Sequence, residues 1–127
     1  SAASKVITVG AYNSFYNSYA DFSGRGFTRL TDQVKPDIAA PGVNITAPAA
    51  NGGYQSVTGT SFATPVASGA AALLMQWGIV NGNDPFLYGE KVKAYLRRGA
   101  RKLPGIAEYP NPMVGYGTLC VRDSLPD

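Results

Sequence analysis

The sequence predicts an α/β fold, and three segments support this prediction. Residues Lys5–Tyr12 (KVITVGAY) form a nearly continuous run of apolar and β-branched residues, typical of a strand covered on both faces. Residues Ser61–Val80 are small or apolar on every side, which predicts a helix buried all round. Residues 83–98 carry apolar side chains at helical spacing. Doubly covered strands combined with buried helices are characteristic of α/β domains.

Composition sets limits on the class of protein. The 127 residues, 45% of them apolar, suit one domain with a core. The longest apolar run, Ala70–Met75, is shorter than a bilayer requires, so we expect no membrane span. The net charge is +3, and four basic residues cluster where a helix is expected to end: Arg97, Arg98, Arg101 and Lys102. Such a cluster favours a solvated helix end over a nucleic-acid site.

The cysteine content and the absence of a visible targeting signal do not identify the cellular compartment. Cys120 is the only cysteine, so no disulfide joins two parts of the chain. No signal-peptide pattern is visible at the start. The chain enters an apolar strand almost at once, and we therefore expect it to be part of a longer polypeptide.

Between the first strand and the long helix, the chain alternates short apolar segments with proline and glycine. This pattern predicts three brief extended segments with a Pro-Gly turn after the first of them: Ile38–Ala40, Val43–Ala47 and Tyr54–Thr58. The last of the three leads directly into Gly59-Thr60-Ser61.

The two helices have different boundary signals. Pro65 is tolerated close to a helix start, which places the start of the long helix near Ser61. The second helix is predicted to be capped by Asn83 or Asp84, with Pro85 in its first turn and Gly99 as a left-handed stop. A final short strand is expected at Thr118–Val121.

Ser61 has two readings at the start of the long helix. A serine there is most often a cap that accepts a hydrogen bond from a backbone N–H. The same position directs free N–H groups and the positive end of the helix dipole at one point, which suits a nucleophile and a developing oxyanion. Position alone leaves both readings open.

The surrounding motif favours the nucleophile. Gly59-Thr60-Ser61-Phe62-Ala63-Thr64-Pro65 resembles G-T-S-x-A-x-P, the serine signature of the subtilisin-like serine proteases. KVITVGA, KPDIAAPG and GYGTL resemble further segments of that family in the same order, so the resemblance covers nearly the whole chain. It implies that residues 1–127 form the C-terminal, serine-bearing part of a three-layer α/β fold with a mostly parallel sheet.

The resemblance also assigns roles. Ser61 would be the acyl-forming nucleophile of a peptide-hydrolysing endopeptidase, and its own N–H would donate to the oxyanion. Thr60 would be an accessory oxyanion donor, or else an ordinary turn hydroxyl. Phe62 would border the leaving-group side of the substrate cleft, or else belong to the core. Val66 occupies a position where many family members have a histidine other than the catalytic one.

The chain cannot supply the rest of the machinery that the resemblance implies. It contains no histidine, and a serine triad needs an imidazole base and an orienting carboxylate. In this family the Asp, the His and the oxyanion-hole Asn come earlier in the chain, so we expect the isolated chain to be inactive. No motif links a lysine to Ser61 as a substitute base: Lys5, Lys35, Lys91, Lys93 and Lys102. Asp37 is expected to cap its own turn, with a cation site as the alternative.

Partners follow from the same reasoning. We expect a peptide or protein substrate, no cofactor, no metal at the site, and room for a structural calcium ion in the complete protein. Uncovered apolar surface would make the chain pair with the missing N-terminal half or self-associate. The alternative is a non-catalytic, subtilisin-like binding or signalling protein, which would have no need of Ser61. LYGEKVKAYLRRGARKLPG and YPNPMVGYGTLCVRD most resemble the bacterial subset that includes spore-germination proteases, which suggests a secreted or spore-associated protein.

Overall fold

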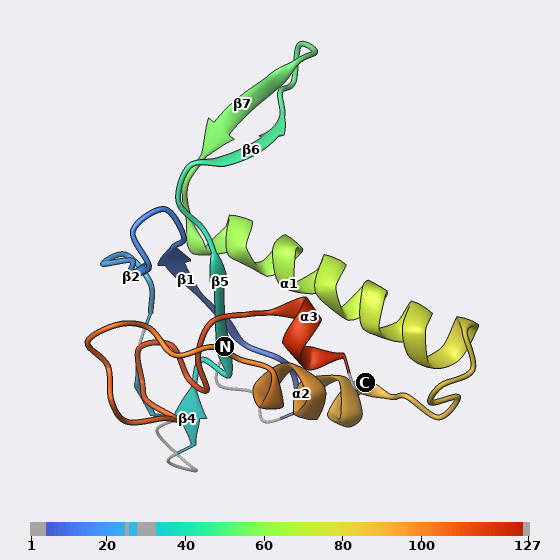
Figure 1. Cartoon of the computed structure of the whole chain (residues 1–127). Helices are drawn as coiled ribbons and strands as arrows, with labels where there is room; N and C mark the ends of the chain where they lie inside the picture. Colours follow the sequence, from blue (N-terminus) through green and yellow to red (C-terminus); the bar gives the residue numbers. More distant parts are fainter. Residues whose placement is uncertain (1–4, 25, 28–32, 126–127) are drawn as a thin grey trace.

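The fold is built around a small sheet with a parallel centre (Figure 1). The computed structural model describes residues 5–24, 26–27 and 33–125. Strand β1 (Val9–Asn13) pairs in parallel with β5 (Ile38–Pro41) and antiparallel with β2 (Ser18–Tyr19). Thr118 forms a parallel bridge to Ala39 on the other edge of β5. The predicted α/β class is therefore confirmed, and the first strand begins at Val9 rather than Lys5.

The helices lie together beside this sheet (Figure 1). Helix α1 (Thr60–Met75) packs against β1 and β5, and it continues as a π-helical segment, η1 (Gln76–Val80). Helices α2 (Gly89–Arg98) and α3 (Val121–Ser124) pack against each other and contact α1. The predicted start of the long helix near Ser61 is confirmed within one residue.

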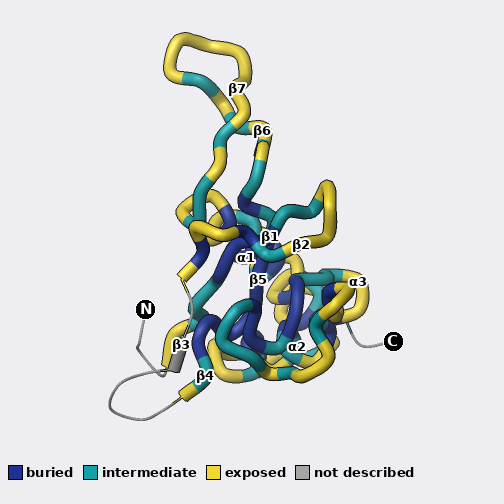
Figure 2. Tube along the Cα trace, turned by 90° about the vertical axis from the view of Figure 1, so that its left-hand side faces the viewer, coloured by how far each residue is buried: buried dark blue, intermediate teal, exposed yellow. Residues whose placement is uncertain are grey.

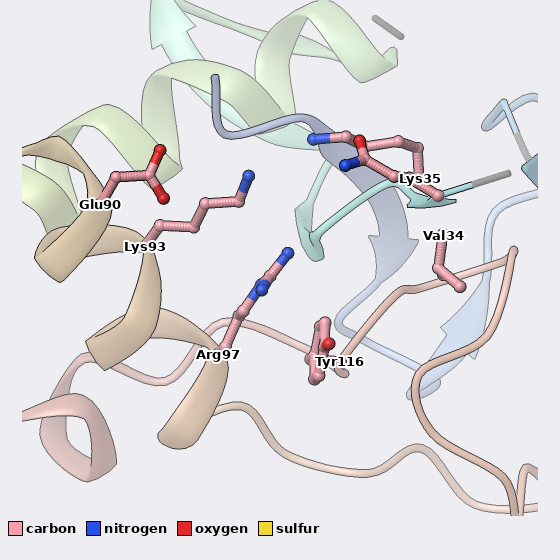
Figure 3. A pocket seen from close by; sticks show the side chains of 7 residues that line it. Val34, Lys35, Glu90, Lys93, Arg97 and Tyr116 are labelled. Atoms are coloured by element: carbon pink, nitrogen blue, oxygen red, sulfur yellow. The ribbon is translucent and has the colours of Figure 1, made fainter. Parts of the chain in front are cut away.

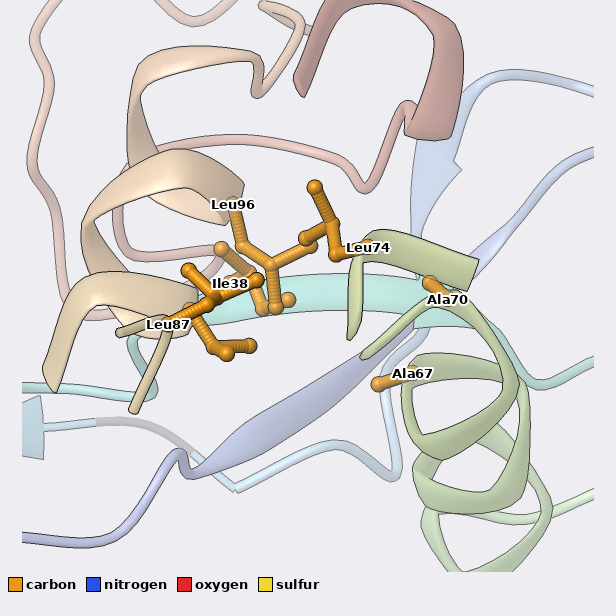
Figure 4. Packing of buried hydrophobic residues seen from close by; sticks show 7 residues of the cluster. Ile38, Ala67, Ala70, Leu74, Leu87 and Leu96 are labelled. Atoms are coloured by element: carbon orange, nitrogen blue, oxygen red, sulfur yellow. The ribbon is translucent and has the colours of Figure 1, made fainter. Parts of the chain in front are cut away.

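Alternation along β5 divides the core between the two faces of the sheet. Ile38 points toward the helices, where it packs with Leu74 and Leu96 (Figure 4). Ala39 points the other way, into a cluster with Leu103 and Val114. Because side chains alternate along a strand, four consecutive residues of β5 serve both sides. The second face is covered by the segment 103–116, so within the described residues only one face of the sheet carries helices.

The expectation that the long helix is buried all round is wrong for this chain (Figure 2). Its buried residues form one stripe at helical spacing: Ala63, Ala67, Ala70 and Leu74. Leu73 is 52% exposed and Val80 is 76% exposed. The physical reason is that the described elements pack against one side of α1 only. A helix that is small and apolar on every side can therefore still have other elements packed on only one side.

A hairpin projects from the body of the molecule (Figure 1). Strand β6 (Ile45–Pro48) pairs antiparallel with β7 (Tyr54–Val57), from Ile45 opposite Val57 to Pro48 opposite Tyr54. These strands confirm the two extended segments predicted before Gly59. A separate pair joins β3 (Gly26–Phe27) to β4 (Val34–Lys35).

The predicted end of the second helix, at Arg98 and Gly99, is confirmed, but its predicted start is wrong. The residues expected to cap it form a turn instead, in which the Leu87 amide donates to the Asp84 carbonyl, and α2 starts at Gly89. Gly99 ends the helix with φ of −84°, which is not left-handed. Its lack of a side chain serves packing, because a Cβ there would lie 2.4 Å from the Ser124 amide nitrogen.

Two smaller expectations also need correction. The predicted strand Thr118–Val121 is wrong: Thr118 forms isolated bridges to Ala39 and Arg101, and Val121 already begins α3. Pro65 is the sixth residue of α1, so its missing N–H would have bonded the Ser61 carbonyl. The proline therefore costs one intrahelical hydrogen bond, contrary to the sequence-based argument.

One helix has the length and composition of a membrane span. Thr60–Val80 has a mean hydropathy of 1.3 in its most apolar window, in a search of the described residues. The uninterrupted apolar run, Ala70–Met75, is short, but small and apolar residues before and after it keep the mean hydropathy of that window high. The buried stripe of this helix packs on the sheet, as in the core helix of a soluble domain, and the expectation of no membrane span stays a prediction.

Candidate active site around Ser61

Ser61 lies at the exposed N-terminal end of the longest helix, α1, which we call the helix mouth. It is the second residue of α1, and its side chain is exposed. The N-cap residue is Gly59, and no side chain caps the helix. The capping interpretation of Ser61 is therefore wrong, because the serine lies inside the helix rather than at its cap. Its hydroxyl is left accessible for chemistry.

Two glycines hold this helix mouth against the end of β5. The Gly59 amide donates to the Gly42 carbonyl at 2.8 Å, and the Gly42 amide donates to the Tyr12 carbonyl at 3.1 Å. The turn that precedes the serine is thus tied by backbone bonds to the carboxyl end of the parallel strands. Ala63, which is fully buried, packs with Ala11 and Ala40 below the turn. The position of Ser61 is consequently fixed by the sheet rather than by a flexible loop.

The electrostatics of the helix mouth favour negative charge. The first turn of α1 contains no acidic residue, so nothing on the helix neutralises the positive end of its dipole. Of the first-turn amides, that of Phe62 donates to the Gly59 carbonyl at 3.0 Å. Such a helix terminus suits an anion or a developing oxyanion near Ser61.

Thr60 and Phe62 lie on either side of Ser61 in the first turn of α1. Thr60 is partly buried, and its carbonyl accepts a bond from the Thr64 hydroxyl at 3.4 Å. Phe62 is 38% exposed, so the interpretation of Phe62 as a core residue receives no support from its burial. Both residues flank the serine on one turn, and their roles at the site remain predictions.

Gly42 is the residue whose replacement most directly disturbs this geometry. A Cβ at Gly42 would lie 2.7 Å from the Ala11 Cβ and 3.0 Å from the Gly59 carbonyl oxygen. We expect Gly42→Ala to lower the free energy of unfolding by about 1–3 kcal/mol and to displace the turn before Ser61. Denaturation curves of the complete protein measure the first effect. Gly89→Ala is the matched control, because a Cβ there meets nothing within 4 Å and Gly89 lies on α2, away from the exposed side of α1.

Lysines do not gather around Ser61 in the described part of the chain. Lys35 and Lys93 pair with Asp37, and Lys91 pairs with Asp84 at 3.0 Å. Lys102 lies over the ring of Tyr109. The Ser–Lys alternative has no structural support among these residues, and the chain has no histidine to act as base.

Asp37 is structural, but it does not cap its own turn as the sequence predicts. It is fully buried and accepts from Lys35 at 2.8 Å, from Arg97 at 2.8 Å and from the Thr8 amide at 2.8 Å. Burial raises the pKa of Asp37, but these bonds lower it more, so the pKa lies below its ordinary value. A carboxylate surrounded by cations is unsuited to a cation site, so that alternative is wrong. No cluster of three or more His, Cys, Asp and Glu occurs within the described residues.

The basic cluster at the end of α2 agrees with the prediction of a solvated helix end, with one exception. Arg98 lies in the last turn of α2 and, like Arg101 and Lys102 beyond it, is exposed. Arg98 stacks on Tyr95, Arg101 pairs with Asp123, and Lys102 lies over Tyr109. Arg97 is the exception, because it reaches the buried Asp37.

Helix α1 buries small residues on the sheet and presents the exposed Ser61 at its N-terminal end. The sequence model of the Subtilase family, Peptidase_S8, matches residues 1–117. The chain therefore belongs to the subtilase family, and its fold is subtilisin-like.

Individual relatives agree with this assignment. Serine protease AprX of Bacillus subtilis (strain 168) is 35% identical, over 96% of this chain and 30% of AprX. Minor extracellular protease Vpr of the same organism is 48% identical, over 84% of this chain and 13% of Vpr. The solved CspB protease of Clostridium perfringens has a TM-score of 0.88 and 47% identity, over 94% of this chain and 25% of that chain. The chain thus spans less than a third of each of these proteins.

Proposed function

We propose that this chain is the serine-bearing, C-terminal part of the peptidase domain of a subtilisin-like endopeptidase. The observation that carries the proposal is the exposed Ser61 at the uncapped start of α1. In the proposed reaction, the Ser61 hydroxyl gives its proton to a base, and its oxygen attacks a peptide carbonyl. The C–N bond then breaks, the amine leaves with that proton, and water hydrolyses the acyl-enzyme to release the acid. The substrate is a peptide or protein.

The α1 terminus supports charge stabilisation in this reaction. As the tetrahedral intermediate forms, the Ser61 N–H donates a hydrogen bond to the former carbonyl oxygen and stabilises its negative charge, with Thr60 as an accessory donor. Phe62 borders the leaving-group side. No acidic residue in the first turn opposes that charge.

The base must come from outside these 127 residues, because the chain contains no histidine. We propose that an upstream part of the same protein supplies the His, the Asp and the oxyanion-hole Asn. The coverage supports this proposal, since the chain corresponds to only 25% of the CspB protease chain and 30% of AprX. The isolated chain is then inactive, and no cofactor is required.

The test is cleavage of protein and peptide substrates by the complete protein, with the products identified by mass spectrometry. The proposal requires new termini inside the substrate, produced by the complete protein and not by the 127-residue chain alone. Absence of cleavage over a broad peptide library, together with replacement of the upstream histidine, would favour a non-catalytic binding or signalling protein.

The exposed side of α1 provides a further prediction about partners. Leu73 and Met75 on α1, and Ile79 and Val80 on its continuation η1, are all at least 41% exposed. Burying such residues is favourable by about 1.5–3 kcal/mol each, so this face favours association. We propose that the N-terminal half of the peptidase domain covers it.

The 127-residue chain alone is therefore expected to self-associate or to be only marginally stable. Sedimentation velocity should detect species larger than a monomer, and Leu73→Lys should shift the distribution toward monomer. Ala94→Lys on the exposed side of α2 is the matched control. A monomeric chain with a sharp, high melting transition would contradict the prediction.

The relatives also suggest where the protein is located. We propose a secreted or spore-associated bacterial protein, close to the subset that includes spore-germination proteases. The name of Vpr describes that relative as extracellular, and the 47% identity with the CspB protease supports a bacterial relationship.

A further inference from the structure

A polar pocket lies between α2 and β4, at the opposite end of the parallel strands from Ser61 (Figure 3). Its volume is about 320 Å³. The lining residues are Gln33, Val34, Lys35, Glu90, Lys93, Arg97 and Tyr116. Lys93 and Arg97 extend from α2 toward Lys35 on β4, and the Arg97 guanidinium lies 4.5 Å from the centre of the Tyr116 ring. The walls are thus dominated by cationic groups.

Among the described residues, the cationic groups of this pocket outnumber the anionic groups. Lys35, Lys93 and Arg97 all pair with Asp37, at 2.8, 3.4 and 2.8 Å. One carboxylate therefore faces three positive charges. The ammonium groups of Lys35 and Lys93 are close enough to share the Val6 carbonyl, each donating at 3.2 Å. Glu90 adds one negative charge at the pocket lining without restoring the balance.

Burial makes this excess of charge costly. The Lys35 and Lys93 side chains are only 8% and 7% exposed. Burial lowers the pKa of Lys93 below its ordinary value; Asp37 opposes this shift, and the charge of Lys35 adds to it. An added negative charge in the pocket would relieve this repulsion.

The cluster also contains a buried donor that has no acceptor among the described residues. The Arg97 Nε is the one buried side-chain polar atom that has no hydrogen-bond partner in the described part of the chain. Both oxygens of Asp37 already accept bonds from cations, and one of them also accepts from the Thr8 amide. A buried donor without an acceptor costs free energy, so the cluster is short of oxygen atoms as well as negative charge.

We propose that this pocket binds a small polyvalent oxyanion of the phosphate class, held by Lys35, Lys93 and Arg97. Ammonium and guanidinium groups form charge-assisted bonds to phosphate oxygens, and the pocket has room for a phosphate-bearing small molecule. Because the cations come from α2 and β4, the bound anion would fasten the helix to the strand. The site is separate from the helix mouth at Ser61, so binding is expected to stabilise the fold without occupying the substrate cleft.

The test is calorimetric titration of the complete protein with inorganic phosphate, at ionic strength held constant with sodium chloride. We expect saturable binding and a rise in melting temperature that chloride alone does not produce. Lys93→Met should weaken phosphate binding by about tenfold or more, because it removes a buried cation at the pocket. Absence of saturable binding by the wild-type protein overturns the proposal.

A variant that keeps the buried cluster intact guards against misfolding as an explanation. Glu90→Gln removes a repelling charge from the pocket lining and should tighten phosphate binding by about two- to fivefold. Glu108→Gln, at an exposed position that does not line the pocket, should leave binding unchanged. Equal affinities for the wild type, Glu90→Gln and Lys93→Met would place the phosphate elsewhere and overturn the proposal.

Discussion

Ser61→Ala is expected to reduce kcat of the complete protein by about 10⁴- to 10⁶-fold, the range for loss of single members of a serine-protease triad. The substitution removes the oxygen that we propose forms the acyl-enzyme. It leaves the fold intact, because the exposed serine does not cap α1 and Ala63 still anchors the helix in the core. Peptide hydrolysis measures the first effect, and the melting temperature measures the second.

Ser68→Ala is the matched control for this experiment. Ser68 lies two turns further along α1, is exposed, and donates to the Thr64 carbonyl at 3.2 Å. Its replacement should leave kcat within about twofold of the wild type, since it lies away from the helix mouth. Comparable losses for the two variants would indicate damage to the helix and would contradict a specific role for Ser61.

Asp37→Asn is expected to lower the free energy of unfolding by about 3–5 kcal/mol. The substitution keeps the shape of the side chain but removes the charge that Lys35, Lys93 and Arg97 share. The three cations then remain close together with no buried carboxylate to balance them. Chemical denaturation followed by circular dichroism measures the loss in the complete protein.

Asp123→Asn provides the contrast, because its pair with Arg101 is exposed on both sides. We expect a much smaller loss of stability, since exposed ion pairs are screened by solvent. Similar losses for the two substitutions would show that burial of the Asp37 cluster contributes nothing special.

The same cluster predicts a pH dependence with a definite sign. The folded pKa of Asp37 lies below its ordinary value, so its stabilisation is present above the unfolded pKa of about 4. It is lost as the pH falls through the folded pKa. Stability of the wild type should therefore decline on acidification below about pH 4 more steeply than stability of Asp37→Asn.

Local signals in the sequence predict some of this structure well. Gly59-Thr60-Ser61 marks the helix start because glycine and small polar residues favour helix boundaries, and α1 begins at Thr60. The short strands before it are bounded by proline and glycine, and β5, β6 and β7 lie where those residues predict them.

The same signals mislead where tertiary contacts compete. Asn83 and Asp84 have the chemistry of helix caps, but Asn83 donates to the Trp77 carbonyl. The Asp84 carboxylate accepts from Lys91 and Tyr95 instead. With these groups engaged, the helix begins only at Gly89. Boundary rules consider neighbours in sequence and cannot weigh such contacts.

In the candidate site too, local features can be predicted from the sequence, whereas contacts between distant residues cannot. Ser61 is recognisable because its motif is local, whereas the anchoring of its turn by Gly42 depends on a close approach of backbones. The Asp37 cluster is harder still, because Arg97 lies 60 residues further along the chain. A lysine two residues before Asp37, and Lys93 and Arg97 on one face of a helix, are the only sequence signals of it.

The most direct measurement of the central claim is reaction of the complete protein with a fluorophosphonate, followed by digestion and mass spectrometry. We predict one phosphonyl adduct on the Ser61 oxygen, absent from Ser61→Ala and retained by Ser68→Ala. An active protein that remains unlabelled at Ser61, or that carries the adduct on another residue, would contradict the assignment of this helix mouth as the reaction centre.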